Sequence, residues 1–343
     1  MRRTLFPFFD DLLDKTVLLS YTRLGYSLRQ GNWKTADLGV DISGRVCLVT
    51  GANSGLGRVT AEALARVGAT VYMLVRSEGK GCWIREGIVQ RTGNQQVHLE
   101  VADLSDLNSV RAFVERFLAR ESRLDVLINN AGALLGERRT SADGFELSFA
   151  TNVLGPFLLT NSLVPALKAS APSRVINVSS GGMYTQKLDV DDLQFERKPY
   201  NGVTAYAQAK RAQVILTELW AEKLAGSGIT VNAMHPGWAD TPGVQRSLPT
   251  FRRWTKKGLR TPAQGADTIV WLAVAESVAG MSGSFWFDRK ARNTHLLPGT
   301  RGSTQDRERL WEECARLTGA NVPVQEPAPS LQESFTEGQV QSE

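Results

Sequence analysis

Short apolar runs alternate along most of the chain with segments in which apolar residues recur every three or four positions. Uninterrupted apolar runs are typical of strands buried on both faces of a parallel sheet, and the wider spacing is typical of amphipathic helices. The alternation therefore predicts an α/β fold in which helices cover both faces of a doubly wound parallel sheet of seven strands. The predicted strands are 46–50, 71–75, 97–101, 126–128, 175–178, 230–234 and, at an edge, 284–287.

Helices are predicted between the strands from the spacing of apolar residues and from residues that favour helix ends. Thr261 followed by Pro262 is typical of a helix start, because threonine caps free amides and proline has no amide to leave unbonded there. Gly319 is typical of a helix end. The predicted helices are 57–67, 110–117, 149–167, 206–224, one that begins at Thr261, and 306–317.

Two flanking segments lie outside the alternating region, which we define as a domain of residues 44–320. Residues 1–43 have apolar residues at rough helical spacing and predict a helical extension, whereas the polar, proline-rich residues 321–343 predict a disordered tail. Two placements are open for the N-terminal helix: packing on the domain, or peripheral contact with a membrane through residues 5–28. We favour packing on the domain, because the polar face is acidic as well as basic.

Composition narrows the classes of partner and the compartment. The net charge of +5 comes without a recognisable nucleic-acid-binding module, so we expect no nucleic-acid partner. The three cysteines and three histidines lack the spacing of a disulfide framework or a metal site, which predicts a reducing compartment and no metal. No apolar run approaches the ~20 residues that span a bilayer, and acidic residues interrupt the N-terminal apolar stretch. We therefore expect a cytoplasmic protein, with peripheral membrane contact as the alternative.

A glycine-rich turn, Thr50-Gly-Ala-Asn-Ser-Gly-Leu-Gly57, lies between the first predicted strand and the first predicted helix. Glycines permit a tight turn and let backbone amides approach a pyrophosphate, to which the helix N-terminus adds partial positive charge. In this strand–turn–helix context the pattern is strong evidence for a Rossmann-type dinucleotide site, although its spacing is G-x-x-x-G-x-G. The candidate cofactor-binding residues of the turn are Gly51, Asn53, Ser54, Gly55, Leu56 and Gly57.

The residue after the second predicted strand bears on the choice of cofactor. Sites for NAD usually place an acid there for the ribose 2′-hydroxyl, whereas an arginine accommodates the 2′-phosphate of NADP. Here Arg76 and Ser77 follow the strand, there is no acid, and Arg58 adds positive charge nearby. We therefore predict NADP(H) rather than NAD(H), with the alternative that Arg76 is only a surface residue.

Tyr206 and Lys210 lie one helical turn apart at the start of a predicted helix and so share one face. An ordinary tyrosine has a pKa near ~10 and is a poor base at neutral pH, but a neighbouring ammonium lowers that pKa. A tyrosine tuned in this way can exchange a proton with a substrate oxygen. Ser179 and Ser180, at the end of the preceding strand, offer a hydroxyl that can hold this oxygen.

Together these motifs resemble the short-chain dehydrogenase/reductase family. The glycine-rich turn, Asn129-Asn-Ala-Gly132, Ser180, Tyr206 with Lys210, and Pro236-Gly237 follow the family order over about residues 44–287. The resemblance implies that Tyr206 is the general acid/base and that Ser180, rather than Ser179, orients the substrate oxygen. It also implies that Lys210 binds the nicotinamide ribose and lowers the pKa of Tyr206.

The resemblance implies further roles outside the Tyr206 helix. Asn152 matches a helix asparagine that holds a water in a proton relay. Asp103 and Leu104 match a pair that contacts adenine, and Asn130 and Ala131 border the adenine ribose. The residues that match contacts of the nicotinamide carboxamide are Pro236, Gly237 and Thr241.

The interval between Ser180 and Tyr206 is longer than in many relatives. Its extra segment, 187–201, is rich in charged residues and predicts a lip over the substrate cleft, with a solvated loop as an equally weighted alternative. Trp238 and Trp286 are candidates to line this cleft.

These patterns predict an NADP(H)-dependent oxidoreductase that interconverts a hydroxyl and a carbonyl on a small or lipid-like substrate. An NADP(H)-binding regulatory protein with little turnover is the alternative, and the intact set of Tyr206, Lys210, Ser180 and Asn152 argues against it. An oligomer is a further expectation, since relatives often pair through the helices that here hold Asn152 and Tyr206.

Overall fold

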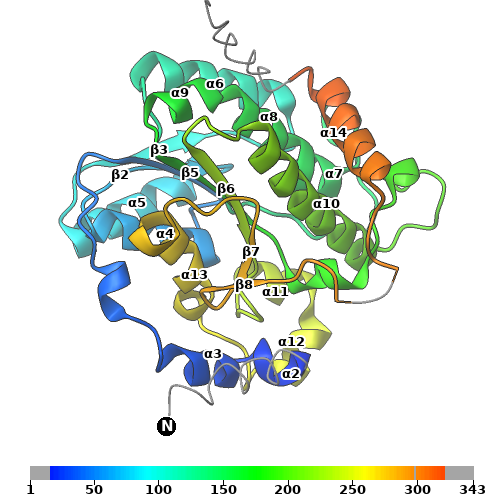
Figure 1. The fold of residues 1–343 in the computed structure, drawn as a ribbon, viewed down its shortest axis with the longest axis horizontal. Helices are drawn as coiled ribbons and strands as arrows, with labels where there is room; N and C mark the ends of the chain where they lie inside the picture. The colour runs from blue at the N-terminus through cyan, green and yellow to red at the C-terminus, as the bar shows by residue number, and fades with distance from the viewer. Residues whose placement is uncertain (1–15, 297–298, 321–343) are drawn as a thin grey trace, which may run out of the picture.

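The computed structural model describes residues 16–296 and 299–320, which form an eight-stranded sheet between two layers of helices (Figure 1). The strand order is β3-β2-β1-β4-β5-β6-β7-β8, so the direction of winding reverses between β1 and β4. The predicted doubly wound α/β fold is therefore confirmed. The first seven strands, which pair in parallel, are β1 Val46–Thr50, β2 Thr70–Val75, β3 Val97–Val101, β4 Val126–Asn129, β5 Ser173–Val178, β6 Ile229–Met234 and β7 Phe285–Phe287.

The prediction of seven strands misses β8, Lys290–Arg292, which pairs antiparallel with β7. With only three residues, two of them charged, this strand gives no apolar run. The turn between the two strands places Asp288 and Arg289 at positive φ, 50° and 57°, as a two-residue hairpin of the type favoured by strand twist requires. Both turn side chains form ion pairs with residues distant in sequence, which stabilises a conformation unusual for these residue types.

The two layers of helices bury separate hydrophobic clusters, one on each face of the sheet. One face is covered by α4 Gly55–Arg66, α5 Glu78–Thr92 and α13 Pro262–Val274. The other is covered by α6 Leu107–Arg120, α8 Gly155–Ser162, α9 Val164–Ala169, α10 Gly202–Lys223 and α14 Thr304–Thr318. The helix α5 is absent from the predicted helices, because buried residues occupy only a few of its positions and its apolar spacing is weak.

The single helix predicted over 149–167 is broken in the structure. A short α7, Leu147–Phe149, leads into a π-helical turn, Ala150–Leu154, which is followed by α8 and α9. Both later helices have a proline in their first turn, Pro156 and Pro165. A proline has no amide to donate to the preceding turn, and such positions interrupt regular α-helical bonding. The break matters because the π turn contains Asn152.

Residues 16–43 of the N-terminal extension pack on the domain. They form α2 Val17–Ser20, α3 Arg23–Gln30 and a 3₁₀ turn, Thr35–Leu38, and Tyr21, Tyr26 and Arg29 are buried against the body. The amide of Arg23 donates to the carbonyl of Gly258, just beyond α12, Pro249–Thr255, so α2 and α12 lie side by side (Figure 1). Residues 1–15 of the predicted extension and the predicted tail 321–343 lie outside the described residues.

Candidate active site

The glycine-rich turn forms a cradle at the carboxyl end of β1. Gly51 has φ +66°, and a Cβ there would lie 3.0 Å from Ala131 Cα; a Cβ on Gly57 would lie 2.5 Å from the Gly51 carbonyl oxygen. Ser54, the residue before α4, makes no side-chain cap, so amides of the first turn keep their hydrogen-bonding capacity for a ligand. The cradle fits a dinucleotide pyrophosphate by shape and by the dipole of α4.

The loop after β4 is tied to this turn. Thr50 Oγ1 accepts hydrogen bonds from the amides of Asn130 and Ala131, each at 2.9 Å, and Asn130 Nδ2 donates to the Thr50 carbonyl at 2.8 Å. The predicted ribose-side residues thus lie directly against the glycine-rich turn. This arrangement also explains why the turn has no room for side chains at Gly51 and Gly57.

The predicted adenine-side residues lie at the carboxyl ends of β2 and β3. Arg76 follows β2, is exposed, and has no ion-pair partner among residues 16–296 and 299–320. Asp103 follows β3 and accepts from the amide and hydroxyl of Ser105 at 2.9 and 2.7 Å, while Leu104 is buried. These contacts fix Asp103 and leave the Arg76 guanidinium available to an anionic group.

The helix α10 carries Tyr206 and Lys210. Asn201 caps it by accepting from the amide of Thr204 at 3.0 Å, which sets where the helix begins. Lys210 is buried, and its ammonium donates to the Val178 carbonyl and to Gln213 Oε1, both at 2.9 Å. Lys210 Nζ lies 5.4 Å from the centre of the Tyr206 ring. Gln213 is not among the predicted site residues, because nothing in the sequence shows that this polar residue lies on a buried face of the helix.

Burial governs the proton affinities of both groups in the chain as it stands. Burial raises the pKa of Tyr206 to about 12, against the smaller opposing effect of a hydrogen bond with Ser180. Burial also lowers the pKa of Lys210 to about 7. The pKa of Tyr206 is thus raised by desolvation in the chain by itself, and Lys210 is not among the groups that shift it. Tyr206 is protonated at neutral pH.

The two adjacent serines at the end of β5 have different surroundings. Ser179 is buried and donates to the Lys210 carbonyl at 2.9 Å, so its hydroxyl is engaged in fixing α10. Ser180 is half-buried, accepts from the Gly182 amide at 3.1 Å, and lies close enough to Tyr206 to lower the pKa of its hydroxyl. The geometry therefore separates a packing serine from one that shares a site with Tyr206.

Asn152 reaches the same site from the π turn. Its Oδ1 accepts from the Ala133 amide at 3.1 Å, and its Nδ2 donates to the carbonyls of Ala133 and Ser148 at 2.8 and 2.7 Å. A Cβ on Gly132 would lie 2.9 Å from Asn152 Oδ1 and 3.3 Å from Lys210 Nζ. Asn152 and Lys210 therefore border one small space at Gly132.

The loop after β6 supplies the remaining predicted residues. Gly237 has φ +68°, and a Cβ there would lie 2.6 Å from Arg260 Nε, so only glycine fits. Thr241 caps α11, Pro242–Ser247, and lies against Gly55 of the glycine-rich turn, where a Cβ would meet it at 3.3 Å. Arg260 Nη1 lies 3.5 Å from the Pro236 carbonyl oxygen. Pro236, Gly237 and Thr241 thus extend from the buried Arg260 to the glycine cradle.

One of the two tryptophans expected to line the cleft does not lie there. Trp238 lies in the loop after β6 with its ring 6.0 Å from Tyr21 and 5.1 Å from Phe251. Trp286 is buried in the core beside Trp271 and donates to Asn232 at 3.0 Å. Its position in β7 directs the side chain toward the helix layer. The sequence pattern does not tell whether this side chain faces the helices or the cleft.

The inserted segment 187–201 is packed against its neighbours. Asp192 is buried and accepts from the amides of Glu196 and Arg197 at 2.7 and 3.2 Å. Asp191 pairs with Arg309 of α14 at 2.6 Å. Tyr200 donates to Glu146, the cap of α7, at 3.1 Å. These contacts oppose the alternative of a solvated loop and connect the segment to the element before Asn152.

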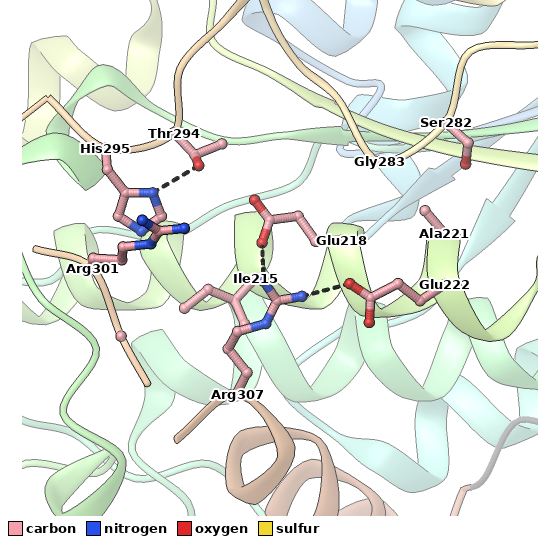
Figure 2. A pocket seen from close by; sticks show the side chains of 11 residues that line it. Ile215, Glu218, Ala221, Glu222, Ser282, Gly283, Thr294, His295, Arg301 and Arg307 are labelled. Carbon is pink, nitrogen blue, oxygen red and sulfur yellow. Dashed lines mark hydrogen bonds and ion pairs between the residues drawn. The ribbon is translucent and has the colours of Figure 1, made fainter. Parts of the chain in front are cut away.

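One open cleft lies away from these residues. It has a volume of about 470 Å³ between α10, α14 and the segment after β8, and Arg307 crosses it to pair with Glu218 and Glu222 at 2.9 and 2.8 Å (Figure 2). No predicted site residue lines it. Within the described ranges, no group of three His, Cys, Asp or Glu side chains is placed to hold a metal ion, and no helix is long and apolar enough to cross a membrane.

The cradle at β1 and the Ser180–Tyr206–Lys210 cluster lie at the carboxyl edge of one parallel sheet. This combination defines a class of NAD(P)-dependent oxidoreductases that act on CH–OH or C=O groups. The chain belongs to the short-chain dehydrogenase family, because the family model described as "short chain dehydrogenase" matches residues 45–250.

Individual relatives agree with this assignment. The chain is 46% identical over 302 residues to dehydrogenase/reductase SDR family member 12 of Homo sapiens, covering 88% of this chain and 94% of that protein. It is 40% identical over 294 residues to retinol dehydrogenase 11 of Homo sapiens, covering 82% and 88%. A crystal structure of a short-chain dehydrogenase from Escherichia coli CFT073 complexed with NADPH is 26% identical, with a TM-score of 0.60, and covers 74% of this chain and 99% of that one.

Proposed function

We propose that the chain is an NADP(H)-dependent oxidoreductase that interconverts a hydroxyl and a carbonyl on a small or lipid-like substrate. The observation that carries the proposal is the cluster of Ser180, Tyr206 and Lys210 beside the glycine cradle. The Ser180 hydroxyl lies beside a tyrosine that is protonated at neutral pH, and the lysine lies one turn further along the same helix. A regulatory protein without turnover has no need for this arrangement of hydroxyls.

Each residue of the cluster has a distinct part in the proposed reaction. A bound nicotinamide supplies or accepts the hydride. During reduction Tyr206 donates its proton to the carbonyl oxygen, and Ser180 donates a hydrogen bond to the same oxygen. Lys210, held by Val178 and Gln213, supplies in its protonated form a positive charge that stabilises the phenolate left on Tyr206. Asn152 fixes the Ala133 backbone next to this cluster.

The preference for NADP(H) is supported by Arg76. Its exposed guanidinium follows β2, where the adenine ribose of a dinucleotide lies in Rossmann-type sites, and no acid competes with it at that position. An arginine fork matches a phosphate monoester in shape and charge. The relative complexed with NADPH is consistent with this preference.

A lipid-like substrate and peripheral membrane contact are supported by one surface, formed by α2, α3 and α12. Leu24 is 54% exposed and Trp254 is 83% exposed, and Leu19 and Leu28 are also exposed. The basic residues of the same elements, and those just after α12, are also exposed: Arg23, Arg253, Lys256 and Lys257. Apolar side chains among basic ones suit the interface of an anionic bilayer.

Turnover assays test the enzymatic proposal. We would follow NADPH and NADH consumption with aldehydes, ketones, retinoids and steroids, using the wild-type chain, Tyr206→Phe and the control Tyr72→Phe. The Tyr72 hydroxyl bonds to Glu121 on another part of the sheet. We expect NADPH-dependent turnover that Tyr206→Phe lowers about 10²- to 10⁴-fold while Tyr72→Phe does not. Tight NADPH binding without any turnover would favour the regulatory alternative.

Co-sedimentation with vesicles tests the membrane proposal separately. The wild-type chain should bind vesicles that contain phosphatidylserine and release them at high salt, and Leu24→Glu with Leu28→Glu should lose binding. The matched control is Leu118→Glu, because Leu118 is an exposed leucine on the opposite helix layer. Equal binding by all three chains would remove the α2–α3–α12 surface from the proposal.

A further inference from the structure

Tyr21, in the short link between α2 and α3, contacts the loop that carries Ser180, far away in sequence. Gly181 follows Ser180 directly, and a Cβ on Gly181 would lie 2.5 Å from Tyr21 Cε2 and 3.2 Å from the Tyr21 hydroxyl oxygen. The edge of the tyrosine ring therefore packs on the backbone beside Ser180. Any larger residue at position 181 would have to displace one of the two.

The other sides of Tyr21 rest on the loop after β6 and on β7. Its ring centre lies 4.6 Å from that of His235, 5.2 Å from that of Phe287 and 6.0 Å from that of Trp238. The carbonyl of Tyr21 accepts from the Trp238 amide at 2.9 Å. Tyr21 is thus a buried wedge between the Ser180 turn and the loop of Pro236 and Gly237.

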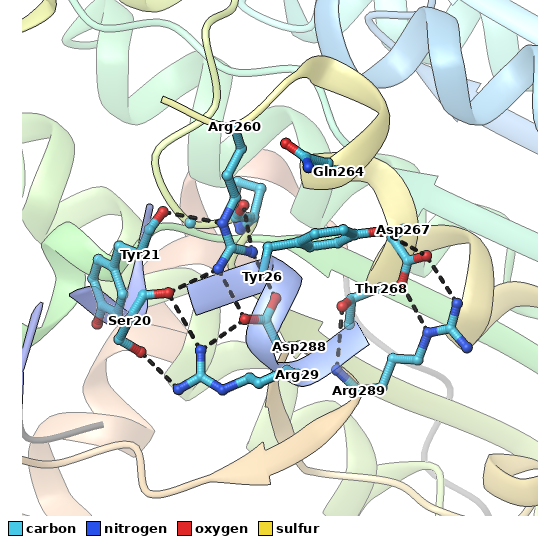
Figure 3. A network of polar contacts seen from close by, with 12 residues as sticks. Ser20, Tyr21, Tyr26, Arg29, Arg260, Gln264, Asp267, Thr268, Asp288 and Arg289 are labelled. Atoms are coloured by element: carbon cyan, nitrogen blue, oxygen red, sulfur yellow. Dashed lines mark hydrogen bonds and ion pairs between the residues drawn. The ribbon is translucent and has the colours of Figure 1, made fainter. Parts of the chain in front are cut away.

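A buried arginine network holds the wedge in place (Figure 3). Arg260 Nε donates to the Tyr21 carbonyl at 3.0 Å, and Arg260 Nη2 donates to the Ser20 carbonyl at 2.8 Å. Asp288 accepts from Arg260 and from Arg29 of α3, at 2.6 and 2.8 Å. All three charged side chains are buried. Burying two arginines and an aspartate costs much of what their attraction returns, so this network contributes more to geometry than to stability.

We propose that Tyr21 is a positioning residue that acts through Gly181 to set where the Ser180 hydroxyl lies. On its other sides, the Tyr21 ring packs against His235, Phe287 and Trp238. The N-terminal extension would therefore contribute to the geometry of the active site, although it lies outside the span of the family model. The inference rests on the proposed function only for its kinetic consequence, since the contact with Gly181 exists without a substrate.

A double-mutant cycle with Ser180 tests whether Tyr21 acts through that serine. In single-turnover reduction, Tyr21→Leu should lower the rate constant about 10- to 100-fold, as small misplacements of a reacting group do, and change the NADPH dissociation constant less than about threefold. In a Ser180→Ala background the same substitution should cost less than about threefold. Multiplicative losses, or an unchanged rate in Tyr21→Leu, would overturn the proposal.

Tyr26 offers the matched control within the same segment. It is buried in α3, packs on Trp33 at 5.1 Å and bonds to Asp267, whereas the three atoms nearest to a Cβ at Gly181 all belong to Tyr21. Tyr26→Leu should lower the unfolding temperature as much as Tyr21→Leu does. Its single-turnover rate constant should not show the Ser180-dependent loss that is expected of Tyr21→Leu. Tyr21→Phe, which keeps the ring against Gly181, should restore most of the rate.

Hydrogen exchange gives a readout that needs no substrate. The Gly182 amide donates to Ser180 Oγ at 3.1 Å, so it reports on the turn that the wedge supports. Exchange across 180–185 should be faster in Tyr21→Leu than in Tyr26→Leu at equal stability. If the wild-type chain turns over no substrate, the proposed function fails, but this measurement still decides the role of Tyr21. Equal exchange in both variants would reject the proposed positioning role of Tyr21.

Discussion

The site lies along the carboxyl edge of the sheet, and its cofactor side and its substrate side are assembled in different ways. On the cofactor side, the glycine-rich turn and the loop after β4 hold each other through Thr50 and Asn130, using backbone contacts and small residues. On the substrate side, the Ser180 turn and the loop after β6 are held by Tyr21, Arg260 and Asp288, which come from opposite ends of the chain. The cofactor half is therefore held by short contacts between two segments that each carry a recognisable motif. The substrate half is held by large buried side chains from segments that no motif marks.

The largest expected effect is the loss of charge at the centre of the long-range network. Asp288→Asn keeps the shape of the side chain and tolerates positive φ, but leaves two buried arginines without a carboxylate. We expect a loss of about 3–5 kcal/mol in the free energy of unfolding, measured by urea titration. Glu62→Gln, which also loses two arginine partners but at the surface, should cost about 0–1 kcal/mol. Similar losses would mean that the two kinds of network do not differ.

The adjacent serines should separate catalysis from packing. Ser180→Ala removes the proposed hydrogen bond to the substrate oxygen and should lower kcat/KM about 10²- to 10³-fold. Ser179→Ala removes the bond to the Lys210 carbonyl and should cost about 1 kcal/mol of stability with a kcat within about threefold of wild type. Steady-state kinetics and thermal unfolding of both variants check this, and a reversed pattern would exchange the two assignments.

Lys210 should make the stability of the chain depend on pH. Its folded pKa of about 7 lies below its ordinary value of 10.5, so the unfolded chain binds more protons above pH 7, and the stability of wild type rises with pH. Lys210→Met lacks this gain. The free energy of unfolding of wild type relative to the variant should increase by about 2 kcal/mol from pH 7 to pH 9. A constant difference would mean that burial does not shift the pKa of Lys210.

The smallest expected effect tests the cofactor half. Arg76→Ala should weaken NADPH binding about tenfold, equal to about 1.4 kcal/mol, and leave NADH binding nearly unchanged, because only NADPH carries the 2′-phosphate. Arg66→Ala, at the far end of α4, is the control. Equal losses for both cofactors in titrations of Arg76→Ala would remove the basis for the NADP(H) preference.

The sequence predicted what is local in this molecule. The strands β1 to β6, the glycine cradle and the Tyr206–Lys210 pair each follow from a pattern within a few residues. The π turn around Asn152 was missed because apolar spacing does not register a break that depends on Pro156. The roles of Tyr21, Gln213 and Arg260 were missed because each depends on a neighbour distant in space or on a burial that a single sequence does not reveal.

The residues at positions 29, 260 and 288 should evolve together, because two arginines share the carboxylate of Asp288. Because Asp288 serves Arg29 and Arg260 at once, a change at any one of them leaves buried charge unmatched until another position changes as well. Descendants of this sequence should therefore inherit the three residues as a set or lose them as a set. Where the set is lost, we expect the first strands and the glycine cradle to persist while the N-terminal segment diverges in length and conformation.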